Sequence, residues 1–300
     1  MYKATEAKLR RNRKRNREKN LTIVLFLIVP LFLLLTFTYL PFLDMIKYSF
    51  MKWDGFSVKK EWVGLKNYIE IFTRPEYLKV LKNSLYYFVG SIIQICLALF
   101  FAMLLNTKVR AENFYKGVIF FPSLINGVAV GMVFLYFYKG GGTLDSVLTF
   151  FGAKGDHPLW LGNPQIVNIS LVFVSLWRYM GQNMVMFNGA VMSVDRELYE
   201  AAGIDGANAW QQFKYIVLPN IRMVVSLNLI LAVKGAISVF EIPYIMTGGS
   251  NGSSTFVIKT LQTAFKSKKI GLASAMGIEL LVLIMIVTFI QKRFIEGKED

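Results

Sequence analysis

The sequence predicts an all-α integral membrane protein with about six spanning helices, and three observations support this fold class. First, the 300-residue chain is 54% hydrophobic and only 18% charged, whereas about a quarter of the residues in a typical soluble protein are charged. Second, several apolar runs reach the length of about 20 residues that crosses a bilayer as a helix. Third, a polar segment near residue 200 separates two of these runs and has helical spacing of its own.

The first 20 residues form a basic tail. Its lysines and arginines are Lys3, Lys8, Arg10, Arg11, Arg13, Lys14, Arg15, Arg17 and Lys19. A basic cluster directly beside a membrane helix indicates a cytoplasmic N-terminus that touches anionic lipid head groups. A nucleic-acid-binding tail is the alternative. We expect membrane lipid as the partner and no nucleic acid, because the cluster adjoins an apolar run.

Six apolar runs follow within a transmembrane domain that we place at residues 21–292. The runs are Leu21–Leu43, Ser84–Leu105, Val118–Tyr138, Ile166–Met192, Val224–Thr247 and Ile270–Ile290. The first run is too long for a cleavable signal peptide and lacks a small-residue cleavage site, so we expect it to be retained. Six crossings return the C-terminal tail, residues 293–300, to the cytoplasm, and no second domain of soluble size is expected.

Several lysines fall in segments that this topology places outside the cell. They are Lys47, Lys52, Lys59, Lys60, Lys66, Lys79, Lys266, Lys268 and Lys269. Cytoplasmic loops normally carry the excess of lysine and arginine. Beyond the N-terminal tail, the charge rule therefore does not choose the orientation. The tail and the polar segment at 195–219 together do.

Two absences limit the chemistry of the chain. One cysteine, Cys96, cannot form a disulfide within the chain, and one histidine, His157, leaves little support for a metal site. No Gly-x-x-x-x-Gly-Lys-Ser/Thr sequence occurs, so we do not expect the chain to hydrolyse ATP. We therefore predict a protein that is not an enzyme and has no metal or cofactor of its own.

The polar segment at 195–219 has the pattern of a helix–turn–helix. Leu198, Ala201 and Ala202 follow helical spacing and give a first short helix with a small-residue edge. Gly206 then supplies a turn where a side chain would be costly.

A second short helix is expected to begin directly after this turn. Asn208, with Gln211 three residues later, predicts a helix start at which the amide side chains satisfy free N–H groups. Pro219 predicts where this second helix stops or bends. The segment would lie across the end of the membrane bundle, with small residues where a partner approaches closely.

A spaced pattern runs through the same segment: Glu-Ala-Ala, three residues, Gly, nine residues, then Ile-x-Leu-Pro. Its residues are Glu200, Ala201, Ala202, Gly206, Ile216, Leu218 and Pro219. The pattern resembles the cytoplasmic EAA loop in permease subunits of binding-protein-dependent ABC importers, specifically the sugar-permease branch. Further stretches extend the resemblance over roughly residues 20 to 292: Val63–Tyr68, Asn83–Leu85, Gly140–Asp145 and Trp160–Pro164. An amphipathic connector without a partner is the simpler reading of the loop alone.

The resemblance implies the type I ABC importer permease fold, with the loop as the coupling helix in a cleft of the ATPase subunit. Glu200 would bond within that cleft, Ala201 and Ala202 would permit close packing, and Gly206 would set the angle between the short helices. The implied partners are a second homologous permease, a dimer of ATP-binding subunits that holds ATP and Mg, an extracellular substrate-binding protein and a sugar. The implied location is the bacterial cytoplasmic membrane, with both termini in the cytoplasm.

Two of the predicted spans contain polar side chains, which are costly at membrane depth and usually face a cavity or a partner. The substrate-path candidates are Arg178, Tyr179, Gln182, Asn183, Lys234, Gly235, Ser238 and Glu241. Lys234, Ser238 and Glu241 are spaced four and three apart, which predicts one helical face. Such groups beside aromatic rings suit a sugar. Alternatively, Arg178 or Lys234 pairs with Glu241 and has only a structural role.

We therefore expect the transmembrane permease subunit of an ATP-driven sugar or oligosaccharide importer. The alternative is a stand-alone ion-coupled secondary transporter, which would show internal repeats and matching broken helices. No convincing repeat is present, and such a transporter has no use for the Glu200 loop. A membrane anchor with an acidic partner would leave Arg178, Lys234 and Glu241 without a role.

Overall fold

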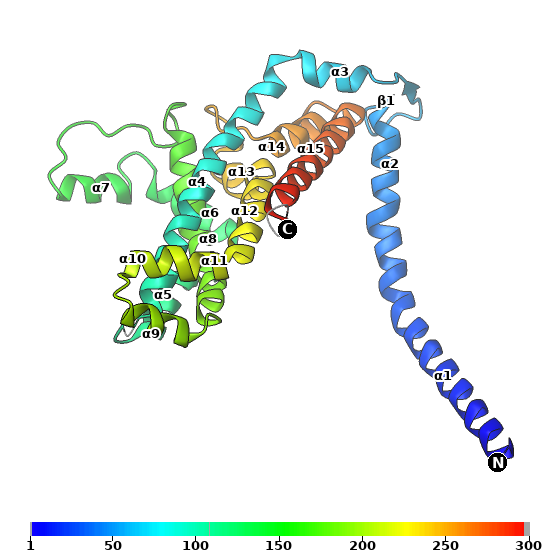
Figure 1. Cartoon of the computed structure of the whole chain (residues 1–300). Helices are drawn as coiled ribbons and strands as arrows, with labels where there is room; N and C mark the ends of the chain where they lie inside the picture. The colour runs from blue at the N-terminus through cyan, green and yellow to red at the C-terminus, as the bar shows by residue number, and fades with distance from the viewer. Residues whose placement is uncertain (1, 108, 297–300) are drawn as a thin grey trace.

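The computed structural model describes residues 2–107 and 109–296, most of them in helices. The predicted all-α membrane fold is confirmed (Figure 1). Its N-terminal part is one long rod made of α1 (Tyr2–Leu34), the π-helical turn η1 (Leu35–Tyr39) and α2 (Leu40–Ser49). The basic side chains of residues 3–15 lie outside the described residues.

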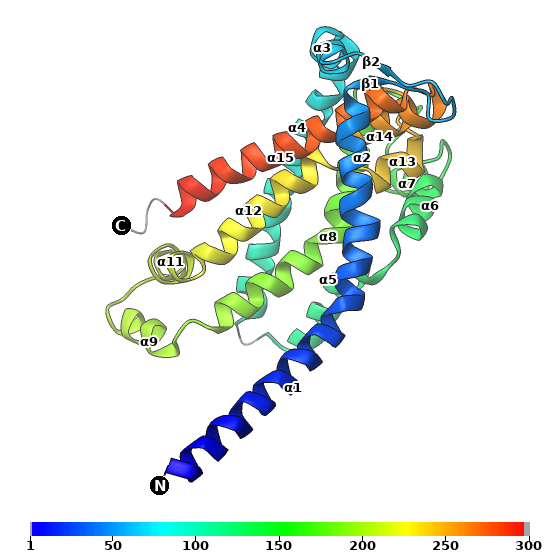
Figure 2. The same cartoon turned by 90° about the vertical axis from the view of Figure 1, so that its right-hand side faces the viewer.

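The rod stands beside the helical bundle and meets it near the top of α2, where α2 packs on α15 (Ile270–Glu296) (Figures 1 and 2). The stretch Asn16–Ser49 of the rod is long and apolar enough to cross a membrane, and none of its most apolar 18-residue window is buried within this chain. Its apolar side chains are therefore free to face lipid or another membrane helix.

A small cap covers one end of the molecule. The strands β1 (Met51–Lys52) and β2 (Glu61–Trp62) pair antiparallel, and α3 (Lys66–Thr73) then leads into the 31-residue α4 (Pro75–Leu105). A proline in the first turn of α4 suits a helix start, because its missing N–H would have had no partner there.

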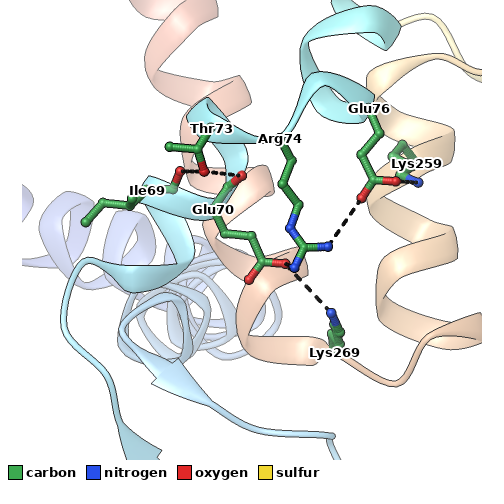
Figure 3. Close-up of polar contacts among 7 residues, drawn as sticks. All are labelled: Ile69, Glu70, Thr73, Arg74, Glu76, Lys259 and Lys269. Atoms are coloured by element: carbon green, nitrogen blue, oxygen red, sulfur yellow. Dashed lines mark hydrogen bonds and ion pairs between the residues drawn. The ribbon is translucent and has the colours of Figure 1, made fainter.

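Ion pairs fasten the cap to the bundle (Figure 3). Glu70 Oε1 lies 3.2 Å from Arg74 Nη2 and 3.7 Å from Lys269 Nζ, while Glu76 Oε2 lies 3.3 Å from Lys259 Nζ. These contacts connect α3 and α4 to α14 (Phe256–Leu261), and to the residues between η3 (Gln262–Lys266) and α15.

The centre of the bundle consists of α4, α8 (Val167–Met192) and α12 (Arg222–Ile237). Around them lie α5 (Glu112–Leu124), α6 (Gly127–Phe137), α7 (Thr143–Phe150) and α13 (Glu241–Thr247). Glycines allow close helix approach here. A Cβ on Gly90 of α4 would overlap Val172 of α8, and a Cβ on Gly181 would overlap the α5 backbone.

Among the described residues, four helical stretches are long and apolar enough to cross a membrane: Asn16–Ser49, Pro75–Leu105, Arg222–Thr247 and Ile270–Arg293. A fifth is the bent pair α5–α6. The predicted span Ile166–Met192 corresponds to α8, which has 26 residues and is not among these stretches. Its polar residues Arg178, Gln182 and Asn183 lower its apolarity below that of the others.

The predicted span Val118–Tyr138 is not one continuous helix, because α5 and α6 meet at an angle of 95°. Pro122, near the end of α5, lacks an N–H and has no place in the middle of a regular helix. Asn126 then starts α6 by accepting a hydrogen bond from the Val128 N–H at 2.9 Å. The Asn126-Gly127 pair inside the run was the available turn signal, whereas the high hydropathy of the run did not indicate the break.

Three clusters of buried side chains hold the bundle together. One surrounds Val167 and Leu171 near the middle, and a third surrounds Ile71 under the cap. The second, which we call the lower cluster, surrounds Phe187 and Val217 near the polar loop at residues 195–219. The molecule thus has two distinct ends, the cap and the polar loop, joined by the packed helices of the bundle.

Candidate coupling loop and membrane cavity

The polar loop folds as a helix–turn–helix, as predicted. The first helix, α9 (Arg196–Ile204), ends in a turn in which Gly206 has a φ of +79°. The Ala207 N–H donates to the Ala202 carbonyl at 2.9 Å and closes this turn. The positive φ explains why glycine is found here, since other residues pay a steric cost in this region.

The second part of the loop begins with the expected capping box. The Asn208 side chain accepts from the Gln211 N–H at 3.0 Å, and the Gln211 side chain accepts from the Asn208 N–H at 2.8 Å. The helix runs through α10 (Ala209–Gln212), the π-helical turn η2 (Phe213–Val217) and α11 (Leu218–Asn220). Pro219 lies in the first turn of α11, and the chain turns at Ile221 into α12.

One side of this loop is anchored to the bundle. Val217 and Ile221 are buried in the lower cluster with Phe187, and Tyr199 and Phe213 pack against the same cluster. The loop is therefore packed against α4, α8 and α12.

The opposite side of the loop is exposed and unusually apolar. Ile204 is 88% exposed, and Trp210 and Tyr215 are also exposed. Of the predicted coupling residues, Glu200, Ala201 and Gly206 are exposed and Ala202 is half-buried. Ile204 was missed by the sequence analysis, because only the fold shows that this isoleucine points away from the bundle. Exposed large apolar side chains on a polar loop indicate a protein partner.

A cavity of about 330 Å³ lies between α4, α8 and α12. Four predicted substrate-path residues line it: Tyr179, Gln182, Asn183 and Gly235. Further polar groups that the sequence analysis did not select also line it: Tyr87, Ser91, Gln94 and Asn228. Gln94 and Asn228 are isolated polar residues within apolar runs, which was the available signal for them. The walls therefore combine tyrosine rings with amide and hydroxyl groups.

Arg178 and Glu241 do not line this cavity and instead pair with each other. The Arg178 Nη1 donates to Glu241 Oε2 at 2.6 Å. The Arg178 side chain is 12% exposed and that of Glu241 is 40% exposed. The structural alternative for this pair, stated from the sequence, is thus the one observed.

The expected common face of Lys234, Ser238 and Glu241 was wrong. The helix α12 ends at Ile237, and Glu241 begins a separate helix, α13, after Phe240 with φ −145° and ψ −56°. The Ser238 hydroxyl donates to the Lys234 carbonyl at 2.7 Å, and the Lys234 side chain is exposed. Lys234 and Ser238 therefore lie outside the cavity lining.

The Arg178–Glu241 pair lies where two interrupted spans meet. Gly127, the first residue of α6, abuts both partners, since a Cβ there would overlap the Arg178 guanidinium and the Glu241 carboxylate. The pair thus fastens α13 to α8, and the start of α6 packs beside it. Within the described residues, no cluster of three or more His, Cys, Asp or Glu side chains could hold a metal ion.

Comparison with known proteins assigns the chain to a family. Residues 94–298 match the family described as "Binding-protein-dependent transport system inner membrane component". The chain belongs to this family. It is 32% identical over 289 residues to the probable ABC transporter permease protein YurN of Bacillus subtilis, covering 94% of this chain and 99% of the relative.

A further relative agrees with this membership, and a solved structure has the same fold. The multiple sugar-binding transport system permease protein MsmF of Streptococcus mutans is 32% identical, covering 89% of this chain and 92% of its own. The fold also matches the bacterial alginate ABC transporter solved in complex with an alginate pentasaccharide-bound periplasmic protein, with a TM-score of 0.80. That match covers 92% of this chain and 94% of the other at 18% identity, and it shows the fold. This family member is thus a multi-pass membrane transport component.

Proposed function

We propose that the chain is a permease subunit of an ATP-driven importer for a sugar or oligosaccharide. The observation that carries the proposal is the α9–α11 loop, which has one side anchored in the core and an exposed apolar side opposite. The sugar class is supported by the relatives, of which MsmF is named for multiple sugars, and by the mixed tyrosine and amide walls of the central cavity.

In this proposal the loop is the contact to an ATP-binding subunit, and ATP and Mg are held by that partner. Ile204 and Trp210 supply apolar anchors, and Glu200 bonds within the partner's cleft. Ala201 and Ala202 allow close approach, and Gly206 fixes the angle between α9 and α10. Closure of two ATP-binding subunits moves the loop, and the lower cluster of buried side chains transmits this movement to the helices around the cavity.

The remaining assembly follows from the same proposal. A second, homologous permease completes the transport path, and an extracellular substrate-binding protein delivers the sugar. The α9–α11 loop and the N-terminus then face the cytoplasm of a bacterial cell, and the β1–β2 cap faces outward (Figure 2). The basic tail beside the first span supports this orientation. An ion-coupled transporter would leave the exposed side of the loop without a function.

The first experiment is mild detergent purification of the tagged protein from its native host, followed by mass spectrometry of the proteins that come with it. We expect a P-loop ATPase and a second permease. A lone protein that transports in vesicles under an ion gradient without ATP would overturn the proposal.

A matched pair of variants then tests the loop itself. Ile204→Asp and Glu200→Lys are expected to lose the ATPase during purification and to abolish ATP-driven sugar uptake. Phe150→Asp changes an equally exposed apolar residue on α7, far from the loop, and should retain both. Full uptake by Ile204→Asp and Glu200→Lys would exclude the loop as the coupling contact.

A further inference from the structure

The outer cap carries lysines that the transport cycle proposed above does not use. The segments at this end contain nine lysines, although an excess of positive charge normally marks the cytoplasmic side. The fold brings six of them around one cavity of about 900 Å³, which we call the lysine cradle. They are Lys52, Lys59, Lys60, Lys66, Lys268 and Lys269. Lys52 and Lys268, which are 216 positions apart in the sequence, thus meet on one surface.

The cradle is formed by elements that are bonded to one another. The Asn67 side chain of α3 donates to the Ser49 carbonyl at 2.8 Å and to the Met51 carbonyl at 2.9 Å. The Gly271 N–H of α15 donates to the Trp53 carbonyl at 3.2 Å. The hairpin, α3 and the start of α15 are therefore held in a fixed relation, and the lysines project from a prepared surface.

The carboxylates in the cradle leave much of the positive charge uncompensated. Asp54 accepts hydrogen bonds from the Ser57 and Phe56 N–H groups, which lower its pKa to about 2, so it is committed to the hairpin loop. Glu70 is shared between Arg74 and Lys269 (Figure 3). Glu61 is the remaining carboxylate of the lining.

Three of the lysines are available for a partner. Among the described residues, Lys52, Lys59 and Lys66 are exposed and have no ion pair within 4 Å. Lys60 has a different role, because its Nζ lies 4.3 Å from the centre of the Trp53 ring. The positive charge of the cradle is thus directed outward from a rigid base.

The rim of the cradle is apolar, which favours a protein over a small anion. Val58 at the tip of the hairpin is 99% exposed, and Phe56, Trp62 and Leu65 are also exposed. Protein interfaces combine apolar and aromatic anchors with charged groups at the rim. A small anion would be bound through the lysines alone and would leave these side chains in water.

We propose that the lysine cradle is the docking surface for an acidic patch on the substrate-binding protein. The inference rests on the proposed function, since it needs the cap to face outward and a binding protein to be present. Complementary charge accelerates association and sets the docking orientation. The cradle therefore explains why lysines gather on the side of the membrane where the charge rule does not expect them.

The test uses the complete importer complex in nanodiscs made of neutral lipid and the substrate-binding protein of the same transport system. Binding is measured at low and high salt for the wild type and for the triple variant Lys52→Glu, Lys59→Glu and Lys66→Glu. We expect the Kd at low salt to rise by about tenfold or more, mainly through slower association. At high salt the difference should shrink, because exposed charges are screened.

The matched control is Lys139→Glu with Lys154→Glu, two exposed lysines near α7 and away from the cradle. This double variant should change the Kd by less than about twofold, and both variants should retain the ATPase activity measured without binding protein. If the triple variant binds as tightly as the wild type, the docking inference is wrong, although the proposed function stands. A second series in nanodiscs that contain anionic lipid separates docking from lipid binding: if the triple variant weakens binding there but not in neutral lipid, the cradle acts through lipid and the inference is also wrong. If the wild-type complex binds no substrate-binding protein, the proposed function itself fails.

Discussion

The Arg178–Glu241 ion pair allows a quantitative prediction, because its two partners differ in exposure. The Arg178 side chain is 12% exposed and Glu241 is 40% exposed. Glu241→Leu leaves a nearly buried guanidinium without its counter-charge. We expect this change to lower the free energy of unfolding by about 3 kcal/mol.

Arg178→Met should lower the free energy of unfolding by less than Glu241→Leu does, because water can reach the remaining carboxylate. Its expected cost is about 1.5 kcal/mol, the lower end for a lost hydrogen bond to a charged group. The double variant should cost less than the sum of the single variants, since no unpaired charge remains. Lys234→Met removes an exposed cation from the neighbouring helix and should stay within about 0.5 kcal/mol of the wild type.

The assay is unfolding of the purified protein in mixed micelles with increasing SDS, followed by tryptophan fluorescence. The reasoning is refuted if Arg178→Met destabilises as much as Glu241→Leu, because the order of the two costs follows directly from the exposures. It is also refuted if the two single effects simply add, since then the partners do not interact.

Three further predictions concern glycines and the hairpin. Gly206→Ala should lower the free energy of unfolding by about 1–2 kcal/mol, because φ is +79° there, and should also lower ATP-driven uptake. The same change at the helical Gly203 should leave the free energy of unfolding unchanged or higher and should not lower uptake. Gly181→Leu should lower the free energy of unfolding in SDS by about 1–3 kcal/mol or more, because its Cβ would meet the α5 backbone. Gly189 faces open space, so Gly189→Leu should not lower the free energy of unfolding. Hydrogen bonds lower the pKa of Asp54 from 3.8 to about 2. The contribution of Asp54 to the stability of the hairpin is therefore complete above pH 3.8 and is lost as the pH falls through 2. Tryptophan fluorescence of the hairpin should be constant from pH 7 to 5, and a transition within that range would contradict the assignment.

The local signals of the sequence proved sufficient for the loop. The turn at Gly206 and the capping box of Asn208 with Gln211 depend on residues within a few positions of one another, and both were confirmed. The apolar runs likewise predicted the all-α membrane fold, since backbone groups in a bilayer must be satisfied within a helix. The family pattern was also recognisable in the sequence, because its spacing is fixed by the same local turn.

Other features depended on contacts between distant segments. The break before Glu241 and the bend before Gly127 occur inside runs of high mean hydropathy, which does not distinguish a straight helix from a broken one. The fold then brings Arg178 to Glu241 over 63 positions and separates Lys234 from both. Gln94 and Asn228 likewise line the cavity because of how the helices pack together. Composition and spacing thus determined the helices, the loop and the class of protein, whereas tertiary packing decided which polar groups face one another, because that choice is made between helices.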